Sequence, residues 1–198
     1  FKYNAKVEPY ERKEFYIIQK IKLKQNIKAC KKEGANLIIM LAHMGGQYNE
    51  EPIELTKEIS RFLLKNGVNI VVGNHEHVVH GGDFSEVKNG KAVTYSLGNF
   101  TGTVGIYKKP FNKMSAYSIS YNIYINNKNI DIKIEKITFS VLKIIKTNNG
   151  GIQVVPAFEL LNNNIDKSQK EKLEEEIKEI AYRFSKKKYD KIEKEFII

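Results

Sequence analysis

Two short runs of apolar residues stand out in the first half of the chain, at 37–42 and 68–72. Continuous apolar runs of this length are typical of strands that are buried in a parallel sheet. A helical pattern of apolar positions over about 17–33 precedes the first run, and a second one over 52–66 separates the two runs. The region 35–77 is therefore predicted to be a strand–helix–strand unit with two buried, parallel strands.

The second half of the chain shows alternating apolar and polar positions, which are typical of strands. Asn89-Gly90 is a hairpin turn signal and precedes a predicted strand over 92–97. A β-rich pattern extends from 115 to 146, with a turn predicted at 126–129, and an amphipathic helical pattern follows over 166–185. We therefore expect an α/β fold that includes a β-rich segment and a C-terminal helix.

The overall composition is that of an ordinary globular protein, with 41% hydrophobic and 28% charged residues. No apolar run approaches the ~20 residues that span a bilayer. The net charge of +10 comes mainly from scattered lysines. Because no arginine-rich or aromatic-interleaved stretch accompanies them, no nucleic-acid partner is expected. An anionic membrane surface, an acidic polymer or a merely solvated surface all fit this charge.

The single cysteine, Cys30, excludes an intrachain disulfide and a multi-cysteine metal site. It lies in the first helical pattern, where we expect it to be packed. The chain begins at Phe1 without a signal-peptide pattern. We therefore expect it to begin in the middle of a longer protein.

Histidines follow both apolar runs directly. His43 follows the first run, and the second run leads through Gly73 to His75 and His77. In α/β sheets, ligands bind outside the carboxyl ends of the strands, and neutral imidazole is the commonest metal ligand in proteins. The i, i+2 spacing and the flexible glycine allow the last two rings to converge on one centre. The sequence therefore predicts a metal site at these strand ends.

Three sequence blocks follow one another around these histidines: His-Met-Gly-Gly-Gln-Tyr at 43–48, Gly-Asn-His-Glu-His-Val-Val-His at 73–80 and Tyr-Ser-Leu-Gly-Asn-Phe at 95–100. In this order they resemble the His-Trp-Gly-x-Glu-Tyr, Gly-x-His-Pro-His-Val-Leu-Gln and Tyr-Ser-Leu-Gly-Asn-Phe blocks of the bacterial capsule-synthesis CapA, or poly-γ-glutamate synthesis, family. The resemblance covers about 30–125.

The resemblance implies a fold similar to that of metallophosphoesterases, an α/β sandwich with its site at strand ends. This chain would be its C-terminal part, with 1–160 in the main domain and 161–198 as a C-terminal helical segment. The Gly-Asn-His-Glu at 73–76 also resembles a middle block of calcineurin-like metallophosphoesterases. Because no histidine follows His80, we interpret the segment as the final block. The carboxylates that complete the two metals are then expected before Phe1.

The resemblance also implies roles for six residues: metal ligation by His43, His75 and His77, catalysis by Asn99, and substrate binding by His80 and Tyr95. Four positions depart from the family pattern, because Met44 replaces Trp, Gln47 replaces Glu, Glu76 replaces Pro and His80 replaces Gln. These changes leave the ligand positions intact and bear on substrate preference. His80 is either a pocket residue or a solvent-exposed substitution.

The implied activity is metal-assisted hydrolysis or transfer on an anionic polymer or another phosphoester substrate. Two divalent ions, of manganese, iron or zinc, would lower the pKa of a bound water and neutralise charge on a phosphoryl or acyl oxygen. Because the chain carries only the histidine half of the site, it is expected to bind metal weakly or to be inactive alone.

The family further implies a membrane-anchored or cell-surface protein with membrane-associated capsule-synthesis partners. Three alternatives stay open. One is a generic metallophosphoesterase such as a nucleotidase, the second is a non-catalytic polymer-binding component at the cell surface, and the third is a structural domain with incidental histidines.

Overall fold

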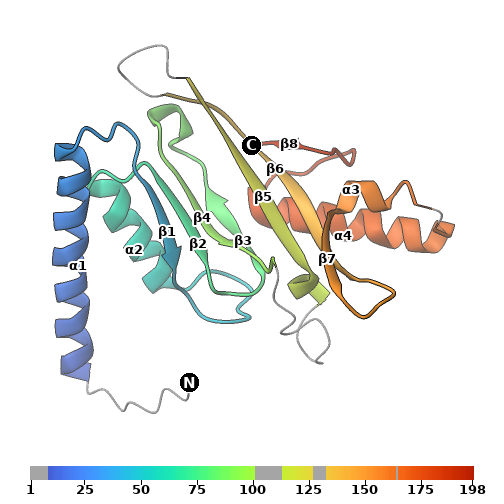
Figure 1. The fold of residues 1–198 in the computed structure, drawn as a ribbon, viewed down its shortest axis with the longest axis horizontal. Coiled ribbons are helices and arrows are strands. Elements are labelled where there is room, and N and C mark those ends of the chain that lie inside the picture. The colour runs from blue at the N-terminus through green and yellow to red at the C-terminus, as the bar shows by residue number, and fades with distance from the viewer. Residues whose placement is uncertain (1–8, 101–112, 127–132, 164) are drawn as a thin grey trace.

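The computed structural model describes residues 9–100, 113–126, 133–163 and 165–198. Its strands form two four-stranded sheets, with helices packed on and beside them (Figure 1). This mixed α/β architecture, with a β-rich segment and a C-terminal helix, agrees with the prediction from the sequence pattern.

The first sheet has the strand order β1-β2-β4-β3. Its members are β1 (Ile39–His43), β2 (Ile70–Asn74), β3 (Val79–Asp83) and β4 (Ala92–Leu97). β1 and β2 are parallel, and α2 (Glu54–Lys65) connects them, so the predicted strand–helix–strand unit is confirmed. β2 is also parallel to β4. β3 is antiparallel to β4. Asn89-Gly90 lies in the connection between them, where Gly90 (φ 72°) ends a short 3-10 helix instead of forming a two-residue hairpin turn.

The second sheet is antiparallel and is formed by the β-rich segment and the chain end. Its members are β5 (Tyr117–Asn126), β6 (Lys133–Lys146), β7 (Ile152–Pro156) and β8 (Phe196–Ile197). Two short helices lie between strands, namely η1 (Val87–Asn89) and η2 (Lys113–Ala116), and a third, α3 (Ala157–Leu160), follows β7. Most of the turn predicted at 126–129 lies outside the described residues.

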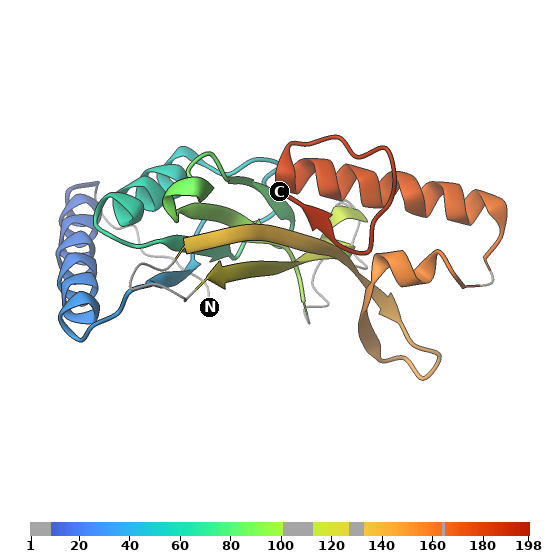
Figure 2. The same cartoon turned by 90° about the horizontal axis from the view of Figure 1, so that it is seen from above.

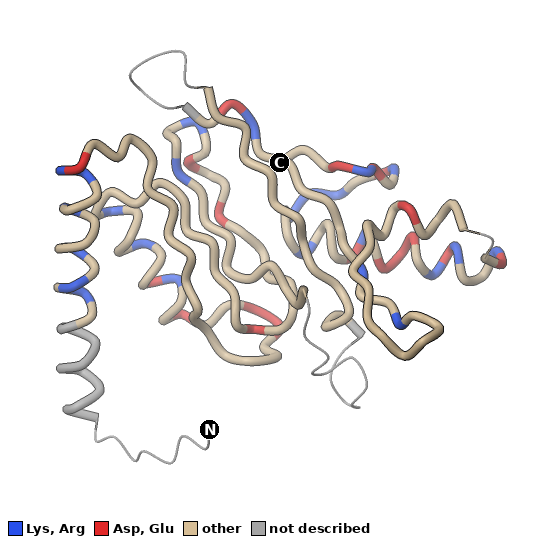
Figure 3. Tube along the Cα trace, viewed as in Figure 1, with Lys and Arg blue, Asp and Glu red and all other residues tan. Residues whose placement is uncertain are grey.

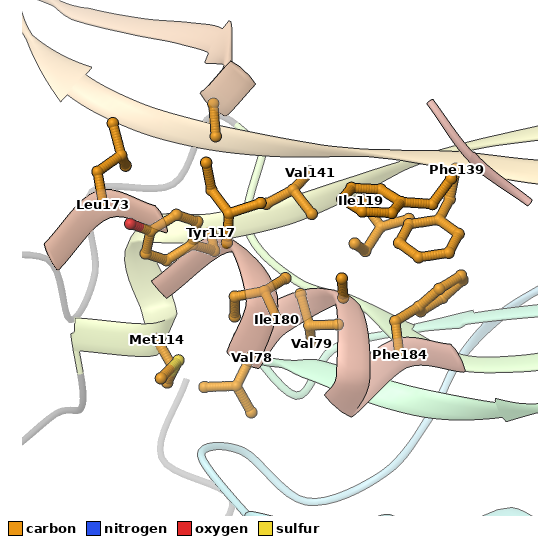
Figure 4. Packing of buried hydrophobic residues seen from close by; sticks show 14 residues of the cluster. Val78, Val79, Met114, Tyr117, Ile119, Phe139, Val141, Leu173, Ile180 and Phe184 are labelled. Atoms are coloured by element: carbon orange, nitrogen blue, oxygen red, sulfur yellow. The ribbon is translucent and has the colours of Figure 1, made fainter. Parts of the chain in front are cut away.

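The C-terminal helix, α4 (Lys167–Ser185), joins the two sheets in one core. Asp166 begins it with a capping box, since its carboxylate accepts the N–H of Gln169 at 2.8 Å. The predicted apolar stripe is buried against β3, β5 and β6 (Figure 4), through Leu173, Ile177, Ile180 and Phe184. The helix is therefore confirmed, whereas the domain division at 160/161 stays a prediction.

The first sheet is covered differently on its two faces. α2 packs on one face through Leu63, Val71 and Val93. α1 (Pro9–Lys32) lies beside α2 (Figure 1), and its Ile27 joins the same cluster. The other face packs against the second sheet, where Ile70 and Ala92 meet Ile134 and Ile137. Figure 2 shows α2 and α4 on the same side of the strands.

β1 differs from its prediction because it is the outer strand of the first sheet in the described part of the chain. Met40 and Ala42 pack against the helices, but Ile39 is 44% and Leu41 is 77% exposed. The prediction that the run at 37–42 is buried is therefore wrong for one face of the strand. Cys30 is also exposed, so the prediction that it is packed is wrong.

The charged side chains are spread over several elements. Figure 3 shows Lys and Arg on the described turns of α1 and on α2, and both signs on α4. None of the described helices combines the length and the hydropathy that crossing a bilayer requires.

Candidate functional site

The three sequence blocks meet at one edge of the first sheet. β1 ends at His43, which pairs in register with Asn74 at the end of β2. His75 and His77 follow β2 directly, and Asn99 follows β4. Because β1, β2 and β4 are parallel, their carboxyl ends lie at the same edge, where α/β sheets place their ligands.

The three histidine rings form a continuous group. The ring centroids of His43 and His75 are 4.4 Å apart in an edge-to-face arrangement, and those of His75 and His77 are 6.3 Å apart. His43 is exposed, and the other two rings are half-buried. Burial lowers the pKa of His75, and the neighbouring His43 and His77 lower it further. His75 is therefore a neutral imidazole at pH 7, which is the form that binds metal ions.

The backbone around these rings is strained. Among the described residues, four that are not glycine have a positive φ, and three of them lie here: Tyr48 (60°), His75 (143°) and His77 (63°). Such conformations are rare for bulky residues and persist only where the surrounding structure holds them. Strain of this kind is concentrated at active and binding sites, so the backbone points to the same place as the histidines.

Asn99 fixes the tautomer of His77. The Nδ2 of Asn99 donates to the Ser115 carbonyl at 2.9 Å, so its Oδ1 faces the Nδ1 of His77 at 2.8 Å. A carbonyl oxygen only accepts hydrogen bonds, so Nδ1 carries a proton, and the neutral ring then has its lone pair on Nε2. This is the arrangement in which ligating histidines are oriented by a second partner. Asn99 thus contacts the predicted ligand His77 directly.

A loop connects β1 to the segment before α2 and closes over the histidines. We call residues 44–51 the strand-end loop. The Tyr48 ring stacks on His77 with centroids 5.0 Å apart and an interplanar angle of 14°. The N–H of Tyr48 donates to the Glu76 carbonyl at 2.8 Å. No role for Tyr48 emerges from its position in the first block, because its positive φ and its stacking are set by tertiary contacts.

Beneath the strand-end loop lies a buried pair, Glu76 and His80, both 0% exposed. Their nearest atoms, Oε1 and Nδ1, are 3.8 Å apart, and neither carboxylate oxygen has a hydrogen-bond partner among the described residues. Burial raises the pKa of Glu76 to about 7, and the nearby Gly46 N–H opposes this only in part. A Cβ on Gly45 would collide with the carboxylate, so this position requires glycine.

The two predicted substrate-binding residues pack against protein. The Nε2 of His80 lies 2.7 Å from the Asn49 carbonyl, and the ring is fully buried, so His80 is not a solvent-exposed substitution. Tyr95 packs beneath α2 in the cluster of Leu63 and Val93, and burial raises its pKa. Substrate binding by these two residues stays a prediction, and neither shares a ring contact with His43, His75 or His77 among the described residues.

The donor set fits a metal ion in part. His75 is neutral, and the neutral tautomer of His77 presents its lone pair on Nε2, which suits ligation. In the described ranges, however, no three His, Cys, Asp or Glu side chains are arranged to hold an ion together. The described residues thus supply oriented imidazoles without a complete coordination sphere.

Comparison with known proteins identifies the family to which the chain belongs. The sequence model of the family described as "Bacterial capsule synthesis protein PGA_cap" matches residues 2–103, which include all three blocks. The chain therefore belongs to this family of bacterial capsule synthesis proteins, as the three blocks predict.

Two curated relatives carry the same designation. The chain is 30% identical over 91 residues to "PGA biosynthesis protein CapA" of Bacillus subtilis, a match that covers 46% of this chain and 23% of that protein. It is 36% identical over 80 residues to "Capsule biosynthesis protein CapA" of Bacillus anthracis, covering 39% of this chain and 19% of that protein. The chain thus matches less than a quarter of the length of either relative.

Proposed function

We propose that this chain carries the histidine half of a metal-dependent, phosphoesterase-like hydrolase site that acts in the biosynthesis of a capsule or poly-γ-glutamate-type surface polymer. The observation that carries the proposal is the His77–Asn99 contact. It selects the tautomer of His77 whose neutral ring has its lone pair on Nε2, beside the neutral His75, at an edge where three parallel strands end. The family and the names of the two relatives support the biosynthetic context.

The fold supports the proposal through the placement of the site. Two sheets face each other, and the site lies at the strand ends of one of them. We propose a metallophosphoesterase-like sandwich as the fold class, and this arrangement supports it. Divalent ions at this edge would supply Lewis acidity towards a phosphoryl or acyl oxygen. His43, His75 and His77 would hold them, with carboxylate ligands contributed from outside the described residues.

Within this scheme each residue has a physical task. Asn99 orients the His77 ring and sets its tautomer, and the neighbouring rings keep His75 neutral. Tyr48 covers one face of His77 and excludes water from it. Because Asn99 acts through His77 in the described contacts, we propose that its contribution to activity includes this orientation.

The test is calorimetric titration of the chelator-treated protein with Mn²⁺ and with Zn²⁺. We expect His75→Ala to weaken binding by about tenfold or more, because it removes a ligand. Glu159→Gln, an exposed carboxylate on α3, is the matched control and should bind as wild type does. Equal affinity in wild type and His75→Ala would refute the metal site.

A hydrolysis assay separates the proposed function from a binding role. With bis(p-nitrophenyl) phosphate as the probe, we expect metal-dependent hydrolysis to be weak in this chain and to disappear in His75→Ala. Hydrolysis that persists in the presence of excess chelator would contradict the proposal. A protein that binds anionic polymer but no metal would instead be a polymer-binding component.

A further inference from the structure

The strand-end loop is held from outside by two other elements. The Nε2–H of His80, on β3, donates to the Asn49 carbonyl at 2.7 Å. Arg183, on α4, donates from Nη1 to the Glu50 carbonyl at 3.1 Å. Lys186, which caps α4, donates from Nζ to the Glu51 carboxylate at 3.2 Å. Three consecutive loop residues are therefore each bound by a side chain that lies far away in the sequence.

The C-terminal end of α4 reaches the loop because it packs closely against β3. A Cβ on Gly81 would lie 2.9 Å from the Arg183 carbonyl oxygen, so only glycine permits this approach. Lys186 ends the helix in a left-handed conformation with φ 59°. Sharing one core with β3, the helix end is a rigid support rather than a loose tail.

The loop needs such a support because of Tyr48. Its left-handed φ of 60° is unfavourable for a tyrosine, and it persists only where neighbouring contacts hold it. The residues directly after Tyr48 are those that His80, Arg183 and Lys186 bind. If these contacts were lost, the loop could relax to a negative φ, and the Tyr48 ring would leave the face of His77.

We propose that Arg183 and Lys186 of α4, together with His80 of β3, are positioning residues that hold the strand-end loop and so keep Tyr48 stacked on His77. The consequence for metal binding rests on the proposed function, whereas the effect on the His77 ring does not. The C-terminal helix therefore acts on the site, although the family match ends at residue 103.

The first test is NMR of the ring nitrogens and protons in protein labelled with ¹⁵N-histidine. The chain has four histidines, so the His77 signal can be assigned with a His77→Gln variant. In the double variant Arg183→Ala/Lys186→Ala, we expect the upfield ring-current shift of His77 to be lost and its Nδ1 proton to exchange faster. The single variant Arg183→Lys keeps a donor at this position and leaves Lys186 in place. It should therefore retain most of the wild-type His77 signal.

Arg61→Ala is the matched control, because Arg61 pairs with Glu54 on the exposed surface of α2. It should leave the His77 signal unchanged. A double variant whose His77 signal equals that of Arg61→Ala, at unchanged helix content, would overturn the proposal.

Substitution of His80 tests the second support. His80→Gln keeps an N–H donor towards Asn49 and should retain the stacked His77 signal, whereas His80→Leu should lose it. His80 is buried, so His80→Leu could unfold the protein. In that case the surface variant Arg183→Ala/Lys186→Ala alone tests the proposal. A stacked signal in folded His80→Leu would show that His80 has no positioning role.

Metal titration separates this proposal from the proposed function. If wild type binds Mn²⁺ or Zn²⁺, we expect the double variant to raise the Kd by about tenfold, as loss of outer contacts to a metal site does. An unchanged Kd would refute the link to the metal. If wild type binds no metal, the proposed function fails, and the His77 signal alone decides whether the loop is positioned in this way.

Discussion

At the scale of single residues, Glu76 carries a clear electrostatic penalty. Its carboxyl is fully buried, and its pKa rises from 4.5 in the unfolded chain to about 7 in the folded protein. The folded state therefore holds a proton that the unfolded state has released, so stability falls as pH rises from about 4.5 to about 7 and stays low above that. We predict that Glu76→Gln raises the free energy of unfolding of the metal-free protein more at pH 8 than at pH 4, and that the two effects differ by about 3 kcal/mol.

Urea denaturation at the two pH values measures this difference. The exposed Glu175→Gln is the control and should change stability equally at both. A gain from Glu76→Gln that is the same at pH 4 and pH 8 would mean that folding does not raise the pKa of this carboxyl.

The residue scale also shows what the sequence can predict of the site. The common location of His43, His75, His77 and Asn99 was predictable because each lies at the end of a recognisable strand, and parallel strands end at one edge. The buried position of His80 and the stacking of Tyr48 were not predictable, because both depend on where α4 and the strand-end loop lie. A positive φ at a tyrosine leaves no mark in a single sequence.

At the scale of elements, one buried polar contact joins α4 to the second sheet. The Tyr117 hydroxyl of β5 donates to the Glu176 carboxylate of α4, and Lys143 of β6 donates to the same oxygen at 2.9 Å. Burial raises the pKa of Tyr117, and its bond to Glu176 raises it further. We predict that Tyr117→Phe lowers the free energy of unfolding by about 1.5–3 kcal/mol, the usual contribution of a hydrogen bond to a charged group.

Thermal or urea unfolding measures this loss, and Tyr124→Phe on the exposed end of β5 is the comparison. Tyr124 also donates to a carboxylate, that of Glu195, but in water, so its loss should cost less than about 1 kcal/mol. Equal effects of the two substitutions would show that burial does not strengthen the Tyr117 contact.

Elements differ in how well their sequence patterns predict them. β4 and α4 have strong local signals, an alternating run after a turn and a capped apolar stripe, and both were predicted closely. β3 was not predicted, because Val-His-Gly-Gly-Asp has low strand propensity and forms a strand only by pairing with β4. The apolar run of β1 predicts a strand correctly, but it carries no information on whether a neighbour covers each face.

At the scale of the whole molecule, the exposed face of β1 is the feature that packing leaves unexplained. Leu41 is 77% exposed on an outer strand, whereas Leu63 of α2 is 1% exposed beneath the same sheet. We predict that Leu41→Ala changes the free energy of unfolding by less than about 1 kcal/mol, while Leu63→Ala costs about 2–5 kcal/mol. Because exposed apolar outer strands promote association, Leu41→Ala should also reduce self-association in sedimentation experiments. A loss for Leu41→Ala as large as that for Leu63→Ala would show that this face is covered in solution.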